Sequence, residues 1–350
     1  MKIRKHTSDQ MTPIERKKAI AAGEDIDRIP CIPFMDGAKS ILSGISIWDY
    51  WHDPMKMAET EIIVFNRFGY DRIVIGPNTR GITEALGGQF IYPKKGVPYL
   101  STPFLTDYRL LDKMDPIRAG THPRIRDFLQ AAGYLCAQAA QIVPIEMSIG
   151  GPFTIASNLR GVEILMRDCR RHPQAIHRLM RVITDSQKSC IDEAAKYSLG
   201  IAMADPVANP MLIGPRLYEE FVYPYTKELT DYVHVQTGHR VSLHMCGKTY
   251  KIWEYLRQYP LNELSLDNVV DLTRAVRELG DILPLAGNVD PVAVILHGTK
   301  EEITAAVHTC IRIGLGSKKG FTLATGCDIP DATRPEQIDH FMTAARDYKY

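Results

Sequence analysis

The stretch Arg240–Gly247, RVSLHMCG, has the residue types of a short β-strand that runs into a glycine. His244 and Cys246 stand two positions apart in it, so their side chains are expected on the same side of the strand. Imidazole nitrogen and thiolate sulfur are both ligands that zinc prefers. Far downstream, Cys327 follows a second apolar run, Gly320–Thr325, just past another glycine. The sequence therefore suggests a zinc site made by two strand ends, from His244, Cys246 and Cys327.

The spacing of these residues alone leaves an alternative open. One close pair and one distant cysteine are a weaker zinc signal than two close pairs. Free cysteine is also among the most buried residue types, so Cys246 and Cys327 would then be inert core thiols and His244 a hydrogen-bonded core histidine. The positions of the two strands in the rest of the chain decide between these interpretations.

Composition and charge narrow the class of protein. The 350 residues are 45% hydrophobic and 24% charged, which is typical of a soluble globular protein, and the net charge of +1 gives no indication of a nucleic-acid partner. Seven cysteines without a close pairing pattern fit a reducing compartment. The first residues lack the apolar core of a signal peptide, and no apolar run reaches the roughly 18 residues of a membrane span. We therefore expect a cytoplasmic protein with no membrane partner.

Eight candidate strands alternate with helical patterns along the chain. They are Arg28–Met35, Tyr70–Gly76, Pro144–Gly151, Gly200–Asp205, Arg240–Gly247, Asn262–Asp267, Asp281–Gly287 and Gly320–Thr325. This alternation predicts an α/β fold, a (β/α)8 TIM barrel. An open doubly wound sheet usually has fewer strands and a glycine-rich phosphate turn after the first strand, which this chain lacks.

We expect a single domain over residues 1–350, because no internal repeat or low-complexity linker divides the chain. Residues 1–27 are predicted to be an N-terminal helical segment, in which Thr12, Pro13 and Glu15 have the pattern of a capping box. Residues 78–123 are predicted to be a small insertion after the second strand, with a hairpin in its Gly-, Pro- and Tyr-rich part.

Polar residues gather where the predicted strands end, which is the active-site face of such barrels. They are Asn78 after the second strand, Asp205 at the end of the fourth, His244 and Cys246 at the fifth, Asp267 at the sixth, Asn288 and Asp290 after the seventh, and Cys327 after the eighth. The fifth and eighth strands are not neighbours, so the three zinc ligands would have to meet across the barrel mouth. A cluster of this composition at one rim favours the zinc site over core packing.

Five motifs carry a resemblance to a known superfamily. They are Met11–Arg16 (MTPIER), Asp27–Pro30 (DRIP), Leu243–Gly247 (LHMCG), Leu285–Pro291 (LAGNVDP) and Ala324–Pro330 (ATGCDIP). In this order and over nearly the whole chain, the sequence resembles the uroporphyrinogen decarboxylase-like barrels. One branch, the methylcobamide:thiol methyltransferases, which includes methylcobamide:coenzyme M methyltransferase, binds zinc through a His-x-Cys pair and a distant Cys. The resemblance implies that His244, Cys246 and Cys327 are the ligands of Zn²⁺.

The haem-pathway decarboxylases form the other branch and use no metal. They carry an arginine-rich segment after the first strand, whereas Phe34–Lys39 (FMDGAK) contains no arginine here. Counting back from Ala85–Gly87, their essential aspartate corresponds to Asn78, and an amide cannot pair as an anion with a protonated pyrrole. The resemblance therefore argues against porphyrinogen decarboxylation. A metal-free lyase acting on another substrate, or a corrinoid-binding scaffold with a structural zinc, stays as an alternative.

The resemblance also implies a mechanism and partners. Coordination to zinc deprotonates a thiol, and the thiolate would attack the methyl group of a methylcobamide and leave the cobalt as Co(I). A cobamide is too large for a packed barrel, and the chain has no Asp-x-His-x-x-Gly cobamide motif, so a separate corrinoid protein is expected to carry it. The methyl acceptor is left open between a thiol and a folate.

The further candidates for binding substrate or corrin amides are Asn78, Glu84, Asp205, Asn209, Asp267, Asn288 and Asp290. For Asp205, Asn209, Asn288 and Asp290 the alternative is a loop-ordering role such as an Asx-turn. Asp267 is a candidate for an exchangeable fourth zinc ligand or for a hydrogen-bond acceptor from His244. Glu84 could equally be a solvated loop acid.

Overall fold

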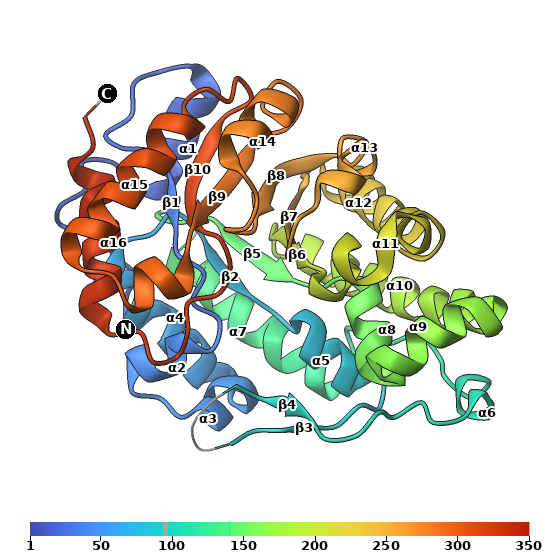
Figure 1. The fold of residues 1–350 in the computed structure, drawn as a ribbon. Coiled ribbons are helices and arrows are strands. Elements are labelled where there is room, and N and C mark those ends of the chain that lie inside the picture. The colour runs from blue at the N-terminus through green and yellow to red at the C-terminus, as the bar shows by residue number, and fades with distance from the viewer. Residues whose placement is uncertain (94–96, 140, 350) are drawn as a thin grey trace.

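The computed structural model describes residues 1–93, 97–139 and 141–349, and in these ranges the chain folds into one parallel eight-stranded sheet. The strand order is β1-β10-β9-β8-β7-β6-β5-β2. The strands are β1 (Cys31–Ile32), β2 (Ile73–Ile75), β5 (Ile145–Ser148), β6 (Gly200–Ala204), β7 (Val241–Met245), β8 (Leu261–Leu266), β9 (Leu285–Val289) and β10 (Phe321–Thr325). The sheet curls on itself with helices around it (Figure 1), which confirms the predicted TIM-barrel fold.

The two end strands, β1 and β2, are joined by side chains as well as backbone. The prolines at positions 30 and 33 flank β1, and proline cannot donate to a strand ladder, so this strand has only two residues. The Asp71 N–H donates to the Cys31 carbonyl (3.0 Å), and the Cys31 N–H donates to Asp71 Oδ2 (2.7 Å). Lys39 Nζ donates to the Val74 carbonyl of β2 (3.2 Å). These contacts close the barrel where regular pairing is missing.

Helices surround the sheet and follow most of its strands (Figure 1). The α-helices are α1 (Pro13–Ala22), α2 (Ala38–Ser43), α3 (Ile47–His52), α4 (Pro54–Phe68), α5 (Asn78–Ala85), α6 (Tyr108–Leu111), α7 (Pro123–Ala139), α8 (Pro152–Arg160), α9 (Val162–Arg171), α10 (Pro173–Ala195), α11 (Pro210–Leu217), α12 (Tyr223–Thr237), α13 (Trp253–Leu256), α14 (Leu272–Leu279), α15 (Lys300–Gly314) and α16 (Pro335–Asp347). Shorter 3-10 or π turns are η1 (Pro206–Ala208), η2 (Tyr218–Val222), η3 (Tyr250–Ile252) and η4 (Pro291–Leu296). Thr12 and Glu15 form the expected capping box at α1. Within the described ranges, no helix has the length and apolarity needed to cross a membrane.

The segment 78–123, predicted as an insertion, contains α5, a hairpin and α6. The hairpin pairs β3 (Phe90–Ile91) antiparallel with β4 (Tyr99–Leu100), as expected, although residues 94–96 between them lie outside the described part. Helix α5 was not predicted. It begins at Asn78, whose φ of 43° is unusual for a residue other than glycine. The division of the chain into a single domain stays a prediction.

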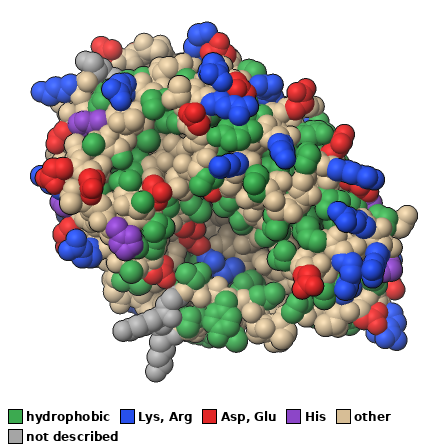
Figure 2. Space-filling model, in the orientation of Figure 1, with side chains coloured by type: hydrophobic (Ala, Val, Ile, Leu, Met, Phe, Trp, Pro, Cys, Tyr) green, Lys and Arg blue, Asp and Glu red, His purple; other side chains and the backbone are tan. Residues whose placement is uncertain are grey.

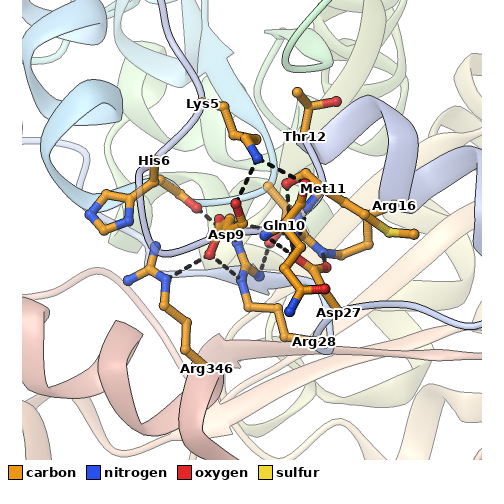
Figure 3. Close-up of polar contacts among 12 residues, drawn as sticks. Lys5, His6, Asp9, Gln10, Met11, Thr12, Arg16, Asp27, Arg28 and Arg346 are labelled. Atoms are coloured by element: carbon orange, nitrogen blue, oxygen red, sulfur yellow. Dashed lines mark hydrogen bonds and ion pairs between the residues drawn. The ribbon is translucent and has the colours of Figure 1, made fainter.

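A buried ionic network fixes the N-terminal segment against the barrel, and Figure 3 shows most of it. Its members are Asp9, Arg16, Asp27, Arg28, Asp71 and Arg346. Arg16 Nε lies 2.8 Å from Asp27 Oδ1, and Arg28 Nη2 lies 2.9 Å from Asp9 Oδ2. Both guanidinium groups also bind Asp71, whose side chain is 7% exposed. The charged residues of the MTPIER and DRIP motifs therefore have a structural role at the barrel base.

Candidate metal centre and its cavity

The structure brings His244, Cys246 and Cys327 together at the carboxyl ends of the strands. His244 lies in β7, Cys246 follows the end of β7, and Cys327 follows the end of β10, which β8 and β9 separate from β7 in the sheet. Their nitrogen and sulfur ligand atoms all lie within 4.8 Å of one another. The Cys246 Sγ is 3.4 Å from His244 Nε2. These three residues, called the triad below, thus meet across the barrel mouth.

Glycines next to the two cysteines allow this approach. Gly247 has a φ of +75°, and a Cβ there would collide with the side-chain amide of Asn209. A Cβ at Gly326 would collide with the backbone nitrogen of Asn268. Larger residues at either position would displace the loop that carries the adjacent cysteine.

The orientation of His244 is set by its neighbour on β8. The register of the two strands places Ser265 beside His244, and Ser265 Oγ lies 2.9 Å from His244 Nδ1. This hydrogen bond directs Nε2 toward Cys246. The ring of Phe34, after β1, lies 5.6 Å from the imidazole ring between centroids. One ring nitrogen is therefore held by the protein and the other faces the two sulfur atoms, as in a metal-binding histidine.

The three side chains share protons and charge. A hydrogen bond from the Cys246 thiol, together with His244, lowers the pKa of Cys327 to about 4 against the opposing effect of burial. The same hydrogen bond and burial raise the pKa of Cys246. Burial lowers the pKa of His244, but the hydrogen bond and charge of Cys327 outweigh it and raise this pKa overall. One imidazole nitrogen and two sulfur atoms are a donor set that fits Zn²⁺, which binds them in their deprotonated forms.

The triad lies on the wall of a cavity of about 300 Å³ inside the barrel mouth. Figure 2 shows this face of the molecule hollowed, with acidic and basic side chains inside the hollow. The charged side chains that line the cavity are Asp36, Lys39, Arg72, Arg80, Glu263 and Asp328. Toward the barrel interior, Arg72 contacts Glu263 (2.6 Å), Glu146 (3.2 Å) and the Ser242 hydroxyl (2.8 Å). A charged layer therefore takes the place of apolar packing below the triad.

Of the predicted binding residues, Asn78 faces this cavity, whereas Asp205 is buried away from it. Asn78 lines it, and its Oδ1 accepts a hydrogen bond from the Arg80 N–H (2.8 Å). Asp205 is 1% exposed and accepts from the Thr154 N–H (2.8 Å) and hydroxyl (2.6 Å). Burial raises the pKa of Asp205 to about 6 in spite of these hydrogen bonds. Asp205 therefore orders the start of α8 instead of facing the cavity.

The other five predicted residues order the loops around the mouth. Asn209 and Asp290 accept backbone hydrogen bonds at the starts of α11 and η4. Asp267 uses both carboxylate oxygens on backbone N–H groups, at 2.6 and 3.1 Å, and Asn288 donates to two carbonyls. Glu84 pairs with an arginine of α7 (2.7 Å) and accepts from a tyrosine hydroxyl. None of the five lines the cavity in the described part of the chain, and their roles in substrate binding stay predictions.

Several cavity residues were missed from sequence. Ser265 belongs to the predicted sixth strand. Its position two residues before Asp267 could have indicated that both side chains lie on the same side of that strand. Asp328 directly follows Cys327 and lines the cavity, where burial and the charge of Asp36 raise its pKa to about 7. Arg80 lies in the segment that was treated as an insertion.

Comparisons with known proteins agree with this architecture. The chain is 25% identical over 349 residues to methylcobamide:CoM methyltransferase MtbA of Methanosarcina mazei, which covers 97% of this chain and 99% of the relative. It is 24% identical to methylcobamide:CoM methyltransferase MtaA of Methanosarcina barkeri, over 96% of this chain and 97% of the relative. A uroporphyrinogen decarboxylase of Hordeum vulgare is 25% identical, over 67% of this chain and 75% of the relative.

A solved structure and a family model complete the comparison. A structure of a methyltransferase from Methanosarcina mazei superposes with a TM-score of 0.83 at 22% identity, over 97% of this chain and 99% of that one, which shows a shared fold. The family model for uroporphyrinogen decarboxylase (URO-D) matches residues 12–348. The chain therefore belongs to the uroporphyrinogen decarboxylase (URO-D) family.

Proposed function

We propose that this protein is a zinc-dependent methyltransferase that moves a methyl group between a methylcobamide, carried by a separate corrinoid protein, and a thiol. The observation that carries the proposal is the triad, because one imidazole and two thiols converge on the wall of a cavity at the barrel mouth. The match over nearly the full chain to two relatives named methylcobamide:CoM methyltransferases supports it.

His244 Nε2 and the sulfur atoms of Cys246 and Cys327 would hold the zinc ion. When bound, zinc supplies the chemistry that lowers the pKa of an acceptor thiol, so that its thiolate is present at neutral pH. Ser265 keeps the imidazole in the orientation that presents Nε2. Hydrogen bonds from Cys246 and His244 lower the pKa of Cys327, which favours the thiolate form that a metal ion binds. With only three protein ligands, a bound zinc ion would also be open to a substrate sulfur.

The dimensions of the cavity support different positions for the two proposed substrates. A small thiol fits into about 300 Å³, whereas a corrin ring does not and has to approach over the mouth. In the transfer, the acceptor sulfur attacks the methyl carbon, a carbon–sulfur bond forms and the cobalt–carbon bond breaks. The bonding electron pair stays on cobalt, which goes from Co(III) to Co(I), and the thiol proton is released. The cavity holds the acceptor sulfur in position for this displacement.

Decarboxylation of a porphyrinogen is less well supported, although the family model carries that name. The resemblance places an essential aspartate where this chain has Asn78. A substrate with many carboxylates also needs unpaired cations, yet the ammonium group of Lys39, after β1, is held by Glu61 at 2.8 Å. The cavity therefore offers little to a polycarboxylate.

The test is methyl transfer from methylcobalamin to thiols by the zinc-loaded protein. The readout is the decrease of the methylcobalamin absorption band. Cys246→Ser and Cys327→Ser are expected to lose both zinc and transfer, because each removes one of the two thiolates. Cys310→Ser, a half-buried cysteine of α15 outside the triad, is the matched control and should retain both. Stoichiometric zinc in either triad variant would contradict the ligand set.

A further inference from the structure

Three hydrogen-bond donors in residues that line the cavity lack a partner. They are the indole Nε1 of Trp51, the hydroxyl of Tyr70 and the Nε of Arg80, and each is a buried atom without a hydrogen bond within the described ranges. The side chains of Trp51 and Tyr70 are each only 2% exposed. Because buried polar atoms are normally paired, the three donors indicate that the cavity takes a molecule that accepts hydrogen bonds.

These donors come from other elements than the triad. Trp51 lies in α3, and its ring has the guanidinium of Arg80, from α5, 4.6 Å above it. Tyr70 stands directly before Asp71, the residue that joins the end strands β1 and β2. The triad belongs to β7 and to the ends of β7 and β10, yet both groups line the same cavity. One small molecule with a sulfur atom and a polar tail can therefore contact the triad and the donors together.

The charge of that tail follows from the cations of the cavity, because each of them already has a carboxylate partner. The pairs are Lys39 with Glu61 (2.8 Å), Arg72 with Glu263 (2.6 Å) and Arg80 with Asp36. An anionic tail would therefore bring an uncompensated charge into the barrel, which is costly. An ammonium group has no lone pair to accept a hydrogen bond. The indole N–H and the phenol O–H are neutral donors and match a neutral acceptor atom.

We infer that the methyl acceptor is a small uncharged thiol with a carbonyl group in its tail, and that the carbonyl oxygen accepts hydrogen bonds from Trp51 and Tyr70 while the sulfur lies at the triad. The inference rests on the proposed function and deepens it, because it names the class of thiol. A carbonyl oxygen has two lone pairs and can accept from two donors. Trp51 and Tyr70 are then residues that determine specificity, and neither contacts the metal ligands in the described structure.

The inference is tested by binding, independently of catalysis. The probes are three S-methyl thioethers of matched shape, 3-(methylthio)propanamide, 3-(methylthio)propanoate and isopentyl methyl sulfide, titrated into the zinc-loaded protein by calorimetry. The amide is expected to bind at least about tenfold more tightly than the carboxylate, which differs from it in charge, and than the hydrocarbon, which has no acceptor in its tail. Equal binding of the three, or tighter binding of the carboxylate, would overturn the inference.

Two variants that each remove one donor assign the preference to residues. Trp51→Phe and Tyr70→Phe keep an aromatic ring, and each should weaken the amide about fivefold while the affinity for isopentyl methyl sulfide stays within about twofold. The matched controls are Trp253→Phe and Tyr218→Phe, whose donors contact Thr249 (2.9 Å) and Tyr259 (3.0 Å) outside the cavity. Both controls should leave the amide affinity unchanged. Unchanged amide affinity in both cavity variants would contradict the assignment.

The stability of the protein without ligand gives a second readout, which also serves if Trp51→Phe does not fold. Tyr70→Phe removes a buried hydroxyl that has no partner in the described residues, so its stability in urea should not fall. Tyr218→Phe breaks a buried contact between two hydroxyl groups, so its stability should fall. A Tyr70→Phe protein that is destabilised as much as Tyr218→Phe would show that the Tyr70 hydroxyl is already paired, and it would overturn the inference.

The methylation assay separates this inference from the proposed function. The acceptors are 3-mercaptopropanamide, 3-mercaptopropanoate and 3-methylbutane-1-thiol, and kcat/KM is expected to be highest for the amide. Transfer with the highest kcat/KM to the carboxylate would retain the methyltransferase and reject the uncharged acceptor. A failure to methylate any of the three, in zinc-loaded protein that binds the thioethers in the expected order, would support the binding site and reject the proposed function alone.

Discussion

The variant Ser265→Ala tests how much the hydrogen bond between Ser265 and His244 contributes to zinc affinity. Ser265 is 2% exposed, and its hydroxyl lies 2.9 Å from His244 Nδ1. Removing the hydroxyl leaves a buried ring nitrogen without a partner, which costs about 1–3 kcal/mol. Because zinc needs the ring in one orientation, this cost falls on the metal-bound state. Converted at about 1.4 kcal/mol per factor of ten, the zinc Kd should rise roughly 5- to 140-fold.

The assay is competition for zinc with a chromophoric chelator at fixed pH. Ser317→Ala provides the matched control, because Ser317 is also buried and donates to a backbone carbonyl at 3.2 Å, far from the triad. Its zinc Kd should stay within about twofold of the parent, while its stability falls by about 1 kcal/mol. Ser265→Thr keeps a hydroxyl and should recover most of the zinc affinity. A Ser265→Ala protein that is folded and has an unchanged zinc Kd would refute the role of this hydrogen bond.

Three further predictions concern the scaffold. Asp71→Asn removes the carboxylate that Arg16 and Arg28 share, and it should lower the free energy of unfolding by about 3–5 kcal/mol, measured in urea. Burial raises the pKa of Asp9, but hydrogen bonds and charge from Arg28 outweigh it and lower the pKa from 3.8 to about 2. The stabilisation by Asp9 is therefore present above about pH 4 and lost as the pH falls toward 2, so Asp9→Asn should flatten the acid-unfolding curve there. Gly247→Ala adds a Cβ in contact with Asn209 at a positive φ, and it should weaken zinc binding at least about tenfold with the barrel intact by circular dichroism.

The barrel strands and the triad were predictable because both depend on local sequence patterns. Short apolar runs ended by glycine mark the strands, and the i, i+2 spacing of His244 and Cys246 follows directly from strand geometry. Cys327 could be joined to them once all eight strands were placed, since the carboxyl ends of parallel strands share one rim. The structure shortens every predicted strand except the sixth, which it shifts by one residue, and it shortens the first most, where prolines remove backbone donors.

The rest of the site depends on contacts that local patterns do not encode. The ion pair of Arg80 with Asp36 and that of Lys39 with Glu61 join residues more than 20 positions apart. Helix α5 follows a proline and begins at a residue with positive φ, so its start has no side-chain cap to mark it. Polar residues after strands, such as Asp267 and Asp290, have the same sequence signature whether they bind a ligand or a backbone N–H. Only the three-dimensional arrangement separates these roles.

The most direct test of the metal centre is X-ray absorption at the zinc edge of the protein purified without added metal, on a sample of measured metal content. The triad predicts one zinc ion per chain, with one nitrogen ligand from His244 and two sulfur ligands from Cys246 and Cys327. The remaining position should be taken by a light atom from solvent, and an added acceptor thiol should replace it with a third sulfur. Protein that neither contains nor takes up zinc, or zinc without sulfur ligands, would contradict the account.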